Sequence, residues 1–384
     1  MPGERRVAVT DQTCRKLVGR GLEVLIERGA GAGAHQSDEA YRAAGATLVD
    51  DAEQVYAEAD VIMKVKEPQF STAKGRSEVS MMRPGQVLVT FLHPASPSNH
   101  EMVRQLAARG VTSLTLDSVP RISRAQTMDA LTSMSTVAGY KAVLAAADRL
   151  ASFVPMVSTA VGMLPPARVL VVGTGVAGLQ ALATAKRLGA VTVAADIRPA
   201  AREQAGSLGA KICDLGVPDD MAVGPGGYAL PLSEACLDRE RGALRAAAAE
   251  SDVVILSALV PGRRAPVLLD DEAVAAMKPG SVVVDIAIDQ GGNCSATAPG
   301  QIVQRWGISI DGTKNIPGQV PVSATRLFAE NVFNFVGLLL GDRGLRLDRD
   351  DEIIAACLVT FEGRIVHAGA LEAMGAAPLS GAAS

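Results

Sequence analysis

Three glycines at a fixed spacing form the most informative chemical pattern in the chain. Gly173, Gly175 and Gly178 read G-x-G-x-x-G, directly after the apolar run RVLVV and at the predicted start of a helix. The first glycine permits a tight turn, the second lets a pyrophosphate approach the backbone, and the third lets helix and strand pack closely. The N–H groups at the helix start attract phosphate. The predicted dinucleotide-binding loop comprises Gly173, Thr174, Gly175, Val176, Ala177 and Gly178.

An acidic residue follows at the spacing that such a loop requires. Asp196 ends the next apolar run, VTVAA, about 20 residues after the glycines. A carboxylate at this position accepts hydrogen bonds from the adenosine ribose and would repel a 2′-phosphate. The sequence therefore predicts NAD(H) rather than NADP(H), with Ile197 and Arg198 beside the ribose.

Two further segments, residues 257–266 (SALVPGRRAP) and 285–293 (DIAIDQGGN), follow predicted strands of the same sheet. Residues at the carboxyl ends of parallel strands face the ligand in a doubly wound sheet. For each residue alone, ordinary turn chemistry explains the pattern equally well. The expected additional cofactor contacts are Ala258, Leu259, Asp289 and Asn315.

A second glycine pattern, Gly29-x-Gly31-x-x-Ala34, matches the same motif but lacks its structural context. The helix after it is expected to begin only near residues 37–39, and Asp50 is expected to open a helix rather than end a strand. The sequence therefore predicts a loop of small residues here.

Other polar residues could act on a second substrate. An arginine and a lysine, Arg6 and Lys66, could hold a carboxylate, and His93 could donate and accept the proton of an oxo-acid reaction. Asp289, from the second half of the chain, is the fourth polar residue of this set. The segment PRISRAQTMD, residues 120–129, adds several polar residues before a long helical stretch. In that segment Gln126 could bind a nicotinamide amide or ribose, while Arg121 and Asp129 could pair; a capped helix start with a solvated ion pair is the alternative.

The elements that must position these residues alternate between short β-branched runs and Ala-rich helical stretches, which predicts an α/β fold. We expect two Rossmann-like, doubly wound parallel-sheet domains joined by long helices. Residues 1–126 and 322–384 would form one discontinuous domain, and residues 127–321 would form the NAD(H)-binding domain.

The composition limits the classes of function. The 384 residues carry a formal net charge of −4, which gives no electrostatic reason to bind nucleic acid. No apolar stretch reaches the roughly 20 residues of a membrane span. The five cysteines form no C-x-x-C pair, so neither a metal site nor a disulfide framework is expected.

Several segments carry a resemblance over essentially the whole chain. With PRISRAQTMDAL, STVAGYKAV, GGYA, ALVPGRRAP and MKPGSVVVD in this order, the sequence resembles the NAD(H)-binding component of proton-translocating nicotinamide nucleotide transhydrogenases and, more distantly, alanine dehydrogenases. Thr132 stands where the transhydrogenases have a serine. The residues that the resemblance implies for hydride transfer are Arg121, Gln126, Asp129, Thr132 and Tyr228.

The resemblance also implies an activity and partners. NADH would pass its hydride to NADP⁺ held by a partner subunit, coupled to proton movement through membrane-embedded subunits. The chain would be a cytoplasmic homodimer, bound to the inner face of the plasma membrane through those partners alone. Two alternatives stay open: an alanine dehydrogenase that uses Arg6, Lys66, His93 and Asp289, and a non-catalytic NAD-sensing protein.

Overall fold

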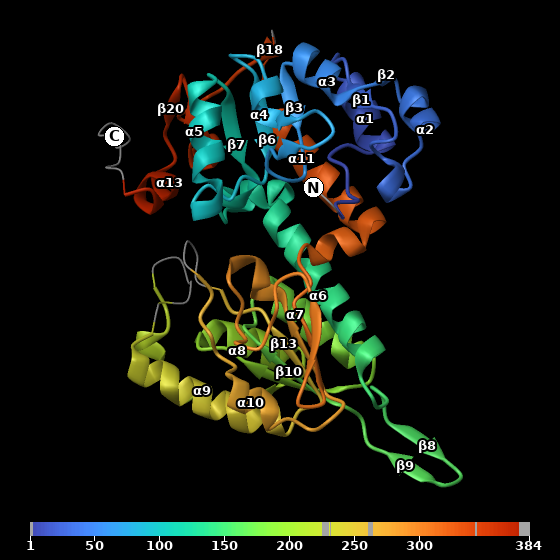
Figure 1. Ribbon diagram of the computed structural model, residues 1–384, viewed down its shortest axis with the longest axis vertical. Helices are drawn as coiled ribbons and strands as arrows, with labels where there is room; N and C mark the ends of the chain where they lie inside the picture. Colours follow the sequence, from blue (N-terminus) through green and yellow to red (C-terminus); the bar gives the residue numbers. More distant parts are fainter. Residues whose placement is uncertain (1–2, 225–229, 231, 260–263, 342–343, 376–384) are drawn as a thin grey trace. The chain divides into compact units, whose positions relative to one another are not determined.

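The computed structural model describes residues 3–224, 230, 232–259, 264–341 and 344–375 (Figure 1). The chain divides into two compact units: unit 1 comprises residues 1–134 and 320–384, and unit 2 comprises residues 135–319. The sequence placed the corresponding boundaries at 126/127 and 321/322. The chain leaves unit 1 within helix α6 (Ala130–Arg149) and re-enters it at helix α11 (Pro321–Leu338).

Unit 2 contains a seven-stranded sheet in the order β12-β11-β10-β13-β14-β16-β15. Its strands are β10 (Arg168–Val172), β11 (Val191–Ala195), β12 (Lys211–Ile212), β13 (Val253–Leu256), β14 (Val282–Asp285), β15 (Ile302–Arg305) and β16 (Ile308–Asp311). All neighbours pair in parallel except β15, which runs antiparallel to β16. The order reverses direction between β10 and β13, which is where doubly wound sheets bind ligands. The predicted fold class is confirmed.

Helices cover both faces of this sheet. They are α6, α7 (Val176–Arg187), α8 (Pro199–Ser207), α9 (Glu234–Ala249) and α10 (Asp271–Ala275). Successive strand residues point to opposite faces: Val171 packs in the cluster that contains α6 and α7, whereas Val172 packs in the cluster that contains α9 and α10. Because both faces are buried, the central strands are continuous β-branched runs, which is why the sequence identified them.

Strand β15 and a hairpin formed by β8 (Val157–Thr159) and β9 (Gly162–Leu164) are the elements of unit 2 that the sequence did not predict. Both are short and largely exposed, so neither shows a run of buried residues.

Unit 1 contains a five-stranded sheet in the order β20-β19-β7-β6-β3 and a separate parallel pair, β1 (Leu25–Glu27) with β2 (Thr47–Val49). The sheet strands are β3 (Val61–Met63), β6 (Val87–Thr90), β7 (Thr112–Thr115), β19 (Leu358–Phe361) and β20 (Arg364–Ile365). Its helices, besides α11, are α1 (Asp11–Val18), α2 (Asp38–Ala43), α3 (Ala52–Glu58), α4 (Glu78–Met81), α5 (His100–Ala108), α12 (Glu352–Cys357) and α13 (Ala368–Ala373). Because β19 pairs antiparallel with β7, the C-terminal part of the chain completes this sheet.

None of the helices in the described part of the chain is long and apolar enough to cross a membrane.

A buried carboxyl group on α9 makes the stability of unit 2 sensitive to pH. Glu240 is 6% exposed, and burial together with the nearby charge of Asp196 raises its pKa to about 7. Ionised Glu240 is therefore less stable in the folded protein than in the unfolded chain. Its contribution to stability is complete at pH values below its ordinary pKa of 4.5, and it is lost as the pH rises through 7.

We predict that Glu240→Gln removes this pH dependence, because a neutral amide replaces the titrating group. The free energy of unfolding of the variant, relative to wild type, should rise by up to about 3 kcal/mol between pH 4.5 and pH 8. Urea unfolding at several pH values measures this difference. A difference that stays constant with pH would contradict the assignment.

Candidate functional site

The glycine loop connects β10 to α7 at the carboxyl edge of the seven-stranded sheet. Gly173 has a φ of +81°, and a Cβ there would lie 2.6 Å from the amide nitrogen of Ala258. A Cβ on Gly178 would lie 2.0 Å from the carbonyl oxygen of Gly173. Gly175 precedes α7 and has open space where its Cβ would be. The first and third glycines thus serve backbone packing, whereas the second leaves the helix N-terminus accessible to a phosphate.

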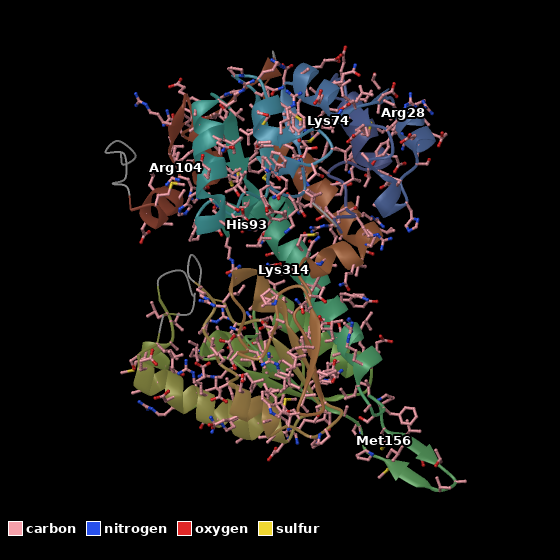
Figure 2. All side chains as sticks on the ribbon, viewed as in Figure 1. Arg28, Lys74, His93, Arg104, Met156 and Lys314 are labelled. Carbon is pink, nitrogen blue, oxygen red and sulfur yellow. The ribbon has the colours of Figure 1, made fainter. Side chains whose placement is uncertain are left out.

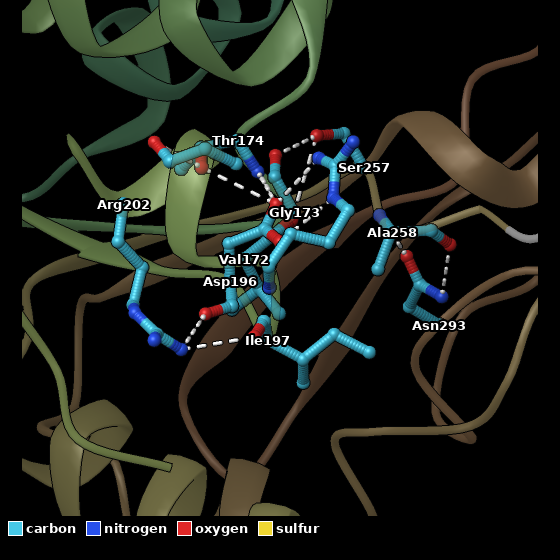
Figure 3. Close-up of polar contacts among 11 residues, drawn as sticks. Val172, Gly173, Thr174, Asp196, Ile197, Arg202, Ser257, Ala258 and Asn293 are labelled. Carbon is cyan, nitrogen blue, oxygen red and sulfur yellow. Dashed lines mark hydrogen bonds and ion pairs between the residues drawn. The ribbon is translucent and has the colours of Figure 1, made fainter. Parts of the chain in front are cut away.

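Asp196 follows β11 and is buried directly beside this loop (Figure 3). Its Oδ2 accepts a 2.7 Å hydrogen bond from the backbone N–H of Thr174, and its Oδ1 accepts one of 2.9 Å from the backbone N–H of Arg198. The Arg198 guanidinium donates to both carboxylate oxygens, at 3.0 and 2.8 Å. A carboxylate that is fixed by hydrogen bonds and paired with an arginine therefore lies where the sequence predicts the adenosine ribose.

The segments after β13 and β14 reach the same edge of the sheet. Ser257 Oγ donates a 2.7 Å hydrogen bond to the carbonyl oxygen of Gly173, and Ala258 packs against that glycine. Leu259 is exposed beside them. The backbone N–H of Asn315, which has a φ of +54°, donates to Asp289 Oδ2 at 3.4 Å. The predicted cofactor contacts of unit 2 thus share the edge that carries the glycine loop.

The second glycine pattern has the predicted small-residue loop. It contains a single 3-10 turn, residues 32–34, and the helix after it begins at Asp38 with Ser37 as its N-cap. The expectation that Asp50 opens a helix is wrong: Asp50 directly follows β2 and pairs with Arg28, whereas Asp51 is the N-cap of α3. This segment lacks the strand-to-helix turn that phosphate binding requires.

Four of the five residues predicted for hydride transfer lie around the start of α6, in unit 1. Arg121 and Gln126 have exposed side chains. Asp129 accepts a 2.8 Å hydrogen bond from the backbone N–H of Thr132 and a 2.7 Å bond from its hydroxyl group. Asp129 is therefore the residue that caps this helix and orients the Thr132 hydroxyl. Tyr228 lies outside the described residues.

Three of the four residues predicted for an oxo-acid pocket belong to unit 1. The buried Arg6 guanidinium makes two hydrogen bonds to the Glu4 carboxylate, at 2.8 and 2.6 Å. His93 follows β6, and its Nδ1 lies 2.7 Å from Asp117 Oδ1. Burial lowers the pKa of His93, but the charge and hydrogen bond of Asp117 outweigh it, so the net shift is upward. Lys66 lies near enough to lower that pKa. The fourth residue, Asp289, belongs to unit 2.

Models of one family match nearly the whole chain. Residues 1–138 match the N-terminal domain of alanine dehydrogenase/PNT, and residues 142–368 match its C-terminal domain. The chain belongs to the alanine dehydrogenase/PNT family. The resemblance seen in the sequence is thereby confirmed.

Alanine dehydrogenase/PNT relatives carry two different names. The chain is 44% identical to the first of the polypeptides that make up the NAD(P) transhydrogenase alpha subunit of Rhodospirillum rubrum, across 95% of each chain. It is 34% identical to an alanine dehydrogenase of Halomonas elongata, across 97% of this chain and 94% of the other. The crystal structure of a transhydrogenase from Sinorhizobium meliloti aligns with a TM-score of 0.83 and 38% identity, across 95% of this chain and 97% of the other.

Sequence reasoning did not single out two buried residues of this site, Asp285 and Asn293. Both were included in a predicted loop segment but were given no role. The available signal was that Asp285 and Asn293 are the first and last residues of DIAIDQGGN, the segment that directly follows an apolar run.

We predict that alanine at Gly175 weakens NADH binding, whereas alanine at Gly178 lowers the free energy of unfolding. Gly175→Ala should keep the free energy of unfolding within about 1 kcal/mol of wild type, because the Cβ has room at a φ of −72°. It should weaken NADH binding at least about tenfold by blocking the pyrophosphate. Gly178→Ala should destabilise the fold by a few kcal/mol through overlap with Gly173.

Calorimetric titration with NADH and urea unfolding measure the two effects. Gly206→Ala, at an open helical position of α8, is the matched control and should leave NADH affinity unchanged. Wild-type affinity in Gly175→Ala would contradict the assignment of this loop.

Proposed function

We propose that this chain is the NAD(H)-binding subunit of a proton-translocating NAD(P) transhydrogenase. It would pass hydride directly from NADH to NADP⁺ bound on a partner subunit, with proton translocation coupled to that transfer. The observation that carries the proposal is the buried Asp196 carboxylate bound to Thr174 of the glycine loop, since it favours a ribose without a 2′-phosphate. The 44% identity to a transhydrogenase subunit supports the choice of reaction.

The residues at the carboxyl edge of unit 2 fit a dinucleotide. The open position at Gly175 would admit the pyrophosphate to the N-terminus of α7. Asp196 would accept hydrogen bonds from the adenosine ribose, with Ile197 and Arg198 beside it. When bound, the nicotinamide ring supplies the hydride chemistry, so the chain's own residues bind and orient it. Ala258, Leu259, Asp289 and Asn315 would contribute along the edge formed by β13, β14 and β16.

The polar segment before α6, residues 120–129, would bind and orient the nicotinamide end of the dinucleotide. Gln126 and Arg121 are exposed residues, and a carboxamide such as that of Gln126 can bind the nicotinamide amide or its ribose. Asp129 would act by holding the Thr132 hydroxyl in one orientation, as its two hydrogen bonds to that residue indicate. A role for Tyr228 in hydride transfer is implied only by the resemblance to the transhydrogenases.

The proposed assembly is a homodimer bound to membrane-embedded subunits at the inner face of the plasma membrane. Within unit 2, the β8–β9 hairpin supports self-association, because its apolar side chains face solvent (Figure 2). Val161 at its tip is 99% exposed, and Met156, Met163 and Leu164 are also exposed. A second copy of the hairpin offers a complementary apolar surface, and exposed apolar patches of this kind typically mark interfaces.

Sedimentation equilibrium tests this interface. Wild-type protein should be dimeric, and the double variant Val161→Asp, Met163→Asp should be largely monomeric, because two buried charges would face apolar surface. A wild-type monomer, or a variant that remains as dimeric as wild type, would contradict the interface.

An alanine dehydrogenase activity is the second candidate, favoured by the His93–Asp117 pair with Lys66 nearby. A histidine paired with a carboxylate can accept and donate the proton of an amino-acid oxidation. Against this candidate, the Arg6 guanidinium is already held by Glu4, so a substrate carboxylate would have to compete for it.

Two assays separate the candidates. The purified chain should not reduce NAD⁺ in the presence of L-alanine. Once mixed with an NADP(H)-binding transhydrogenase subunit, it should transfer hydride between NADH and an NADP⁺ analogue, because this chain holds only one of the two nucleotides. Turnover of L-alanine at an enzyme-like rate, without a partner, would contradict the transhydrogenase proposal.

A further inference from the structure

We propose that Asn293 is a positioning residue for the nicotinamide half of the dinucleotide and that it acts through the backbone of Ala258. The inference rests on the proposed function in one respect, the binding of NAD(H) at the carboxyl edge of unit 2. Asn293 is not itself one of the predicted cofactor contacts, but it bonds one of them, Ala258.

The Asn293 side chain is fully buried, and its carboxamide pairs with the peptide groups of a neighbouring segment (Figure 3). Its Oδ1 accepts a 2.9 Å hydrogen bond from the backbone N–H of Ala258. Its Nδ2 donates to the carbonyl oxygen of Ala258 at 2.9 Å and to that of Pro266 at 2.8 Å. One amide group therefore fixes the backbone at both Ala258 and Pro266.

The backbone of Asn293 is fixed as firmly as its side chain. The buried Asp285 carboxylate, at the end of β14, accepts hydrogen bonds from the backbone N–H groups of Asn293 and Cys294 at 2.9 and 3.1 Å. The Asn293 carbonyl oxygen accepts from the N–H groups of Leu268 and Leu269. A Cβ on Gly292 would lie 2.7 Å from Asp285 Oδ2, so the turn admits no larger residue there. The hydrogen bonds to its backbone therefore hold the Asn293 carboxamide in a fixed position.

The Ala258 backbone forms one side of the candidate dinucleotide site. The Ala258 backbone approaches Gly173 so closely that a Cβ on that glycine would clash with it, and Ser257 bonds the Gly173 carbonyl oxygen. A displacement of Ala258 would therefore move the wall next to the glycine loop. Asp196, which follows β11, is the proposed contact of the adenosine ribose. The nicotinamide half of the dinucleotide would therefore lie on the β13 side of the point where the strand order reverses. Asn293 should consequently affect that half and spare the adenosine half.

Titration calorimetry with two ligands, NADH and AMP, tests this assignment. Asn293→Ala should weaken NADH binding about 10- to 100-fold while AMP affinity stays within about twofold of wild type. Asn293→Asp has the same size but directs a carboxylate oxygen at two carbonyl oxygens, so NADH should bind more weakly to it at pH 8 than at pH 6. The protonated acid can still donate one of the two lost hydrogen bonds.

Ser251→Ala is the matched control, because the Ser251 hydroxyl is also fully buried but bonds the Ala247 carbonyl oxygen at the opposite edge of the sheet. It should keep wild-type affinity for both ligands. Unchanged NADH affinity in both Asn293 variants would overturn the inference, as would equal losses for NADH and AMP, which indicate general damage. A wild-type chain that binds neither ligand would overturn the proposed NAD(H) binding as well.

Discussion

The geometry of the candidate site depends on the close approach of three backbone segments at the carboxyl end of β10. A Cβ on Gly173 would meet the Ala258 backbone at 2.6 Å, and one on Gly178 would meet the Gly173 carbonyl oxygen at 2.0 Å. Only glycine allows α7 and the segment after β13 to meet the strand end so closely. The N-terminus of α7 is thereby held at the point where the sheet order reverses, with the open Gly175 in front of it.

Charge at this point is arranged around a single carboxylate. Asp196 is held by the Thr174 N–H and neutralised by Arg198, whereas the neighbouring carboxyl group of Glu240 has its pKa raised to about 7 by burial and by Asp196. Glu240 is therefore largely neutral below pH 7, and Asp196 is the carboxylate that we propose to meet the ribose. A 2′-phosphate would add negative charge beside it, which is the physical basis for proposing NAD(H).

The sequence predicted the buried elements well and the polar contacts poorly. The β-branched runs of β10, β11, β13 and β14 identified the sheet because both of its faces are covered. The exposed strand β15 gave no such signal. Asp129 contacts Thr132 only because of the turn geometry at the start of α6. The Asn293 carboxamide contacts Ala258 only because tertiary packing brings the two residues together. Spacing alone predicted where ligand contacts would gather, but not which groups support them.

We propose that hydride passes directly between two nucleotides, one of them bound by this chain. The most direct measurement uses NADH carrying deuterium at the transferred C4 position, with NADP⁺ and an NADP(H)-binding transhydrogenase subunit in ordinary water. The deuterium should appear at C4 of the NADPH product, because the two nicotinamide rings would exchange hydride with no intermediate carrier. Product that carries hydrogen from the solvent instead would contradict it.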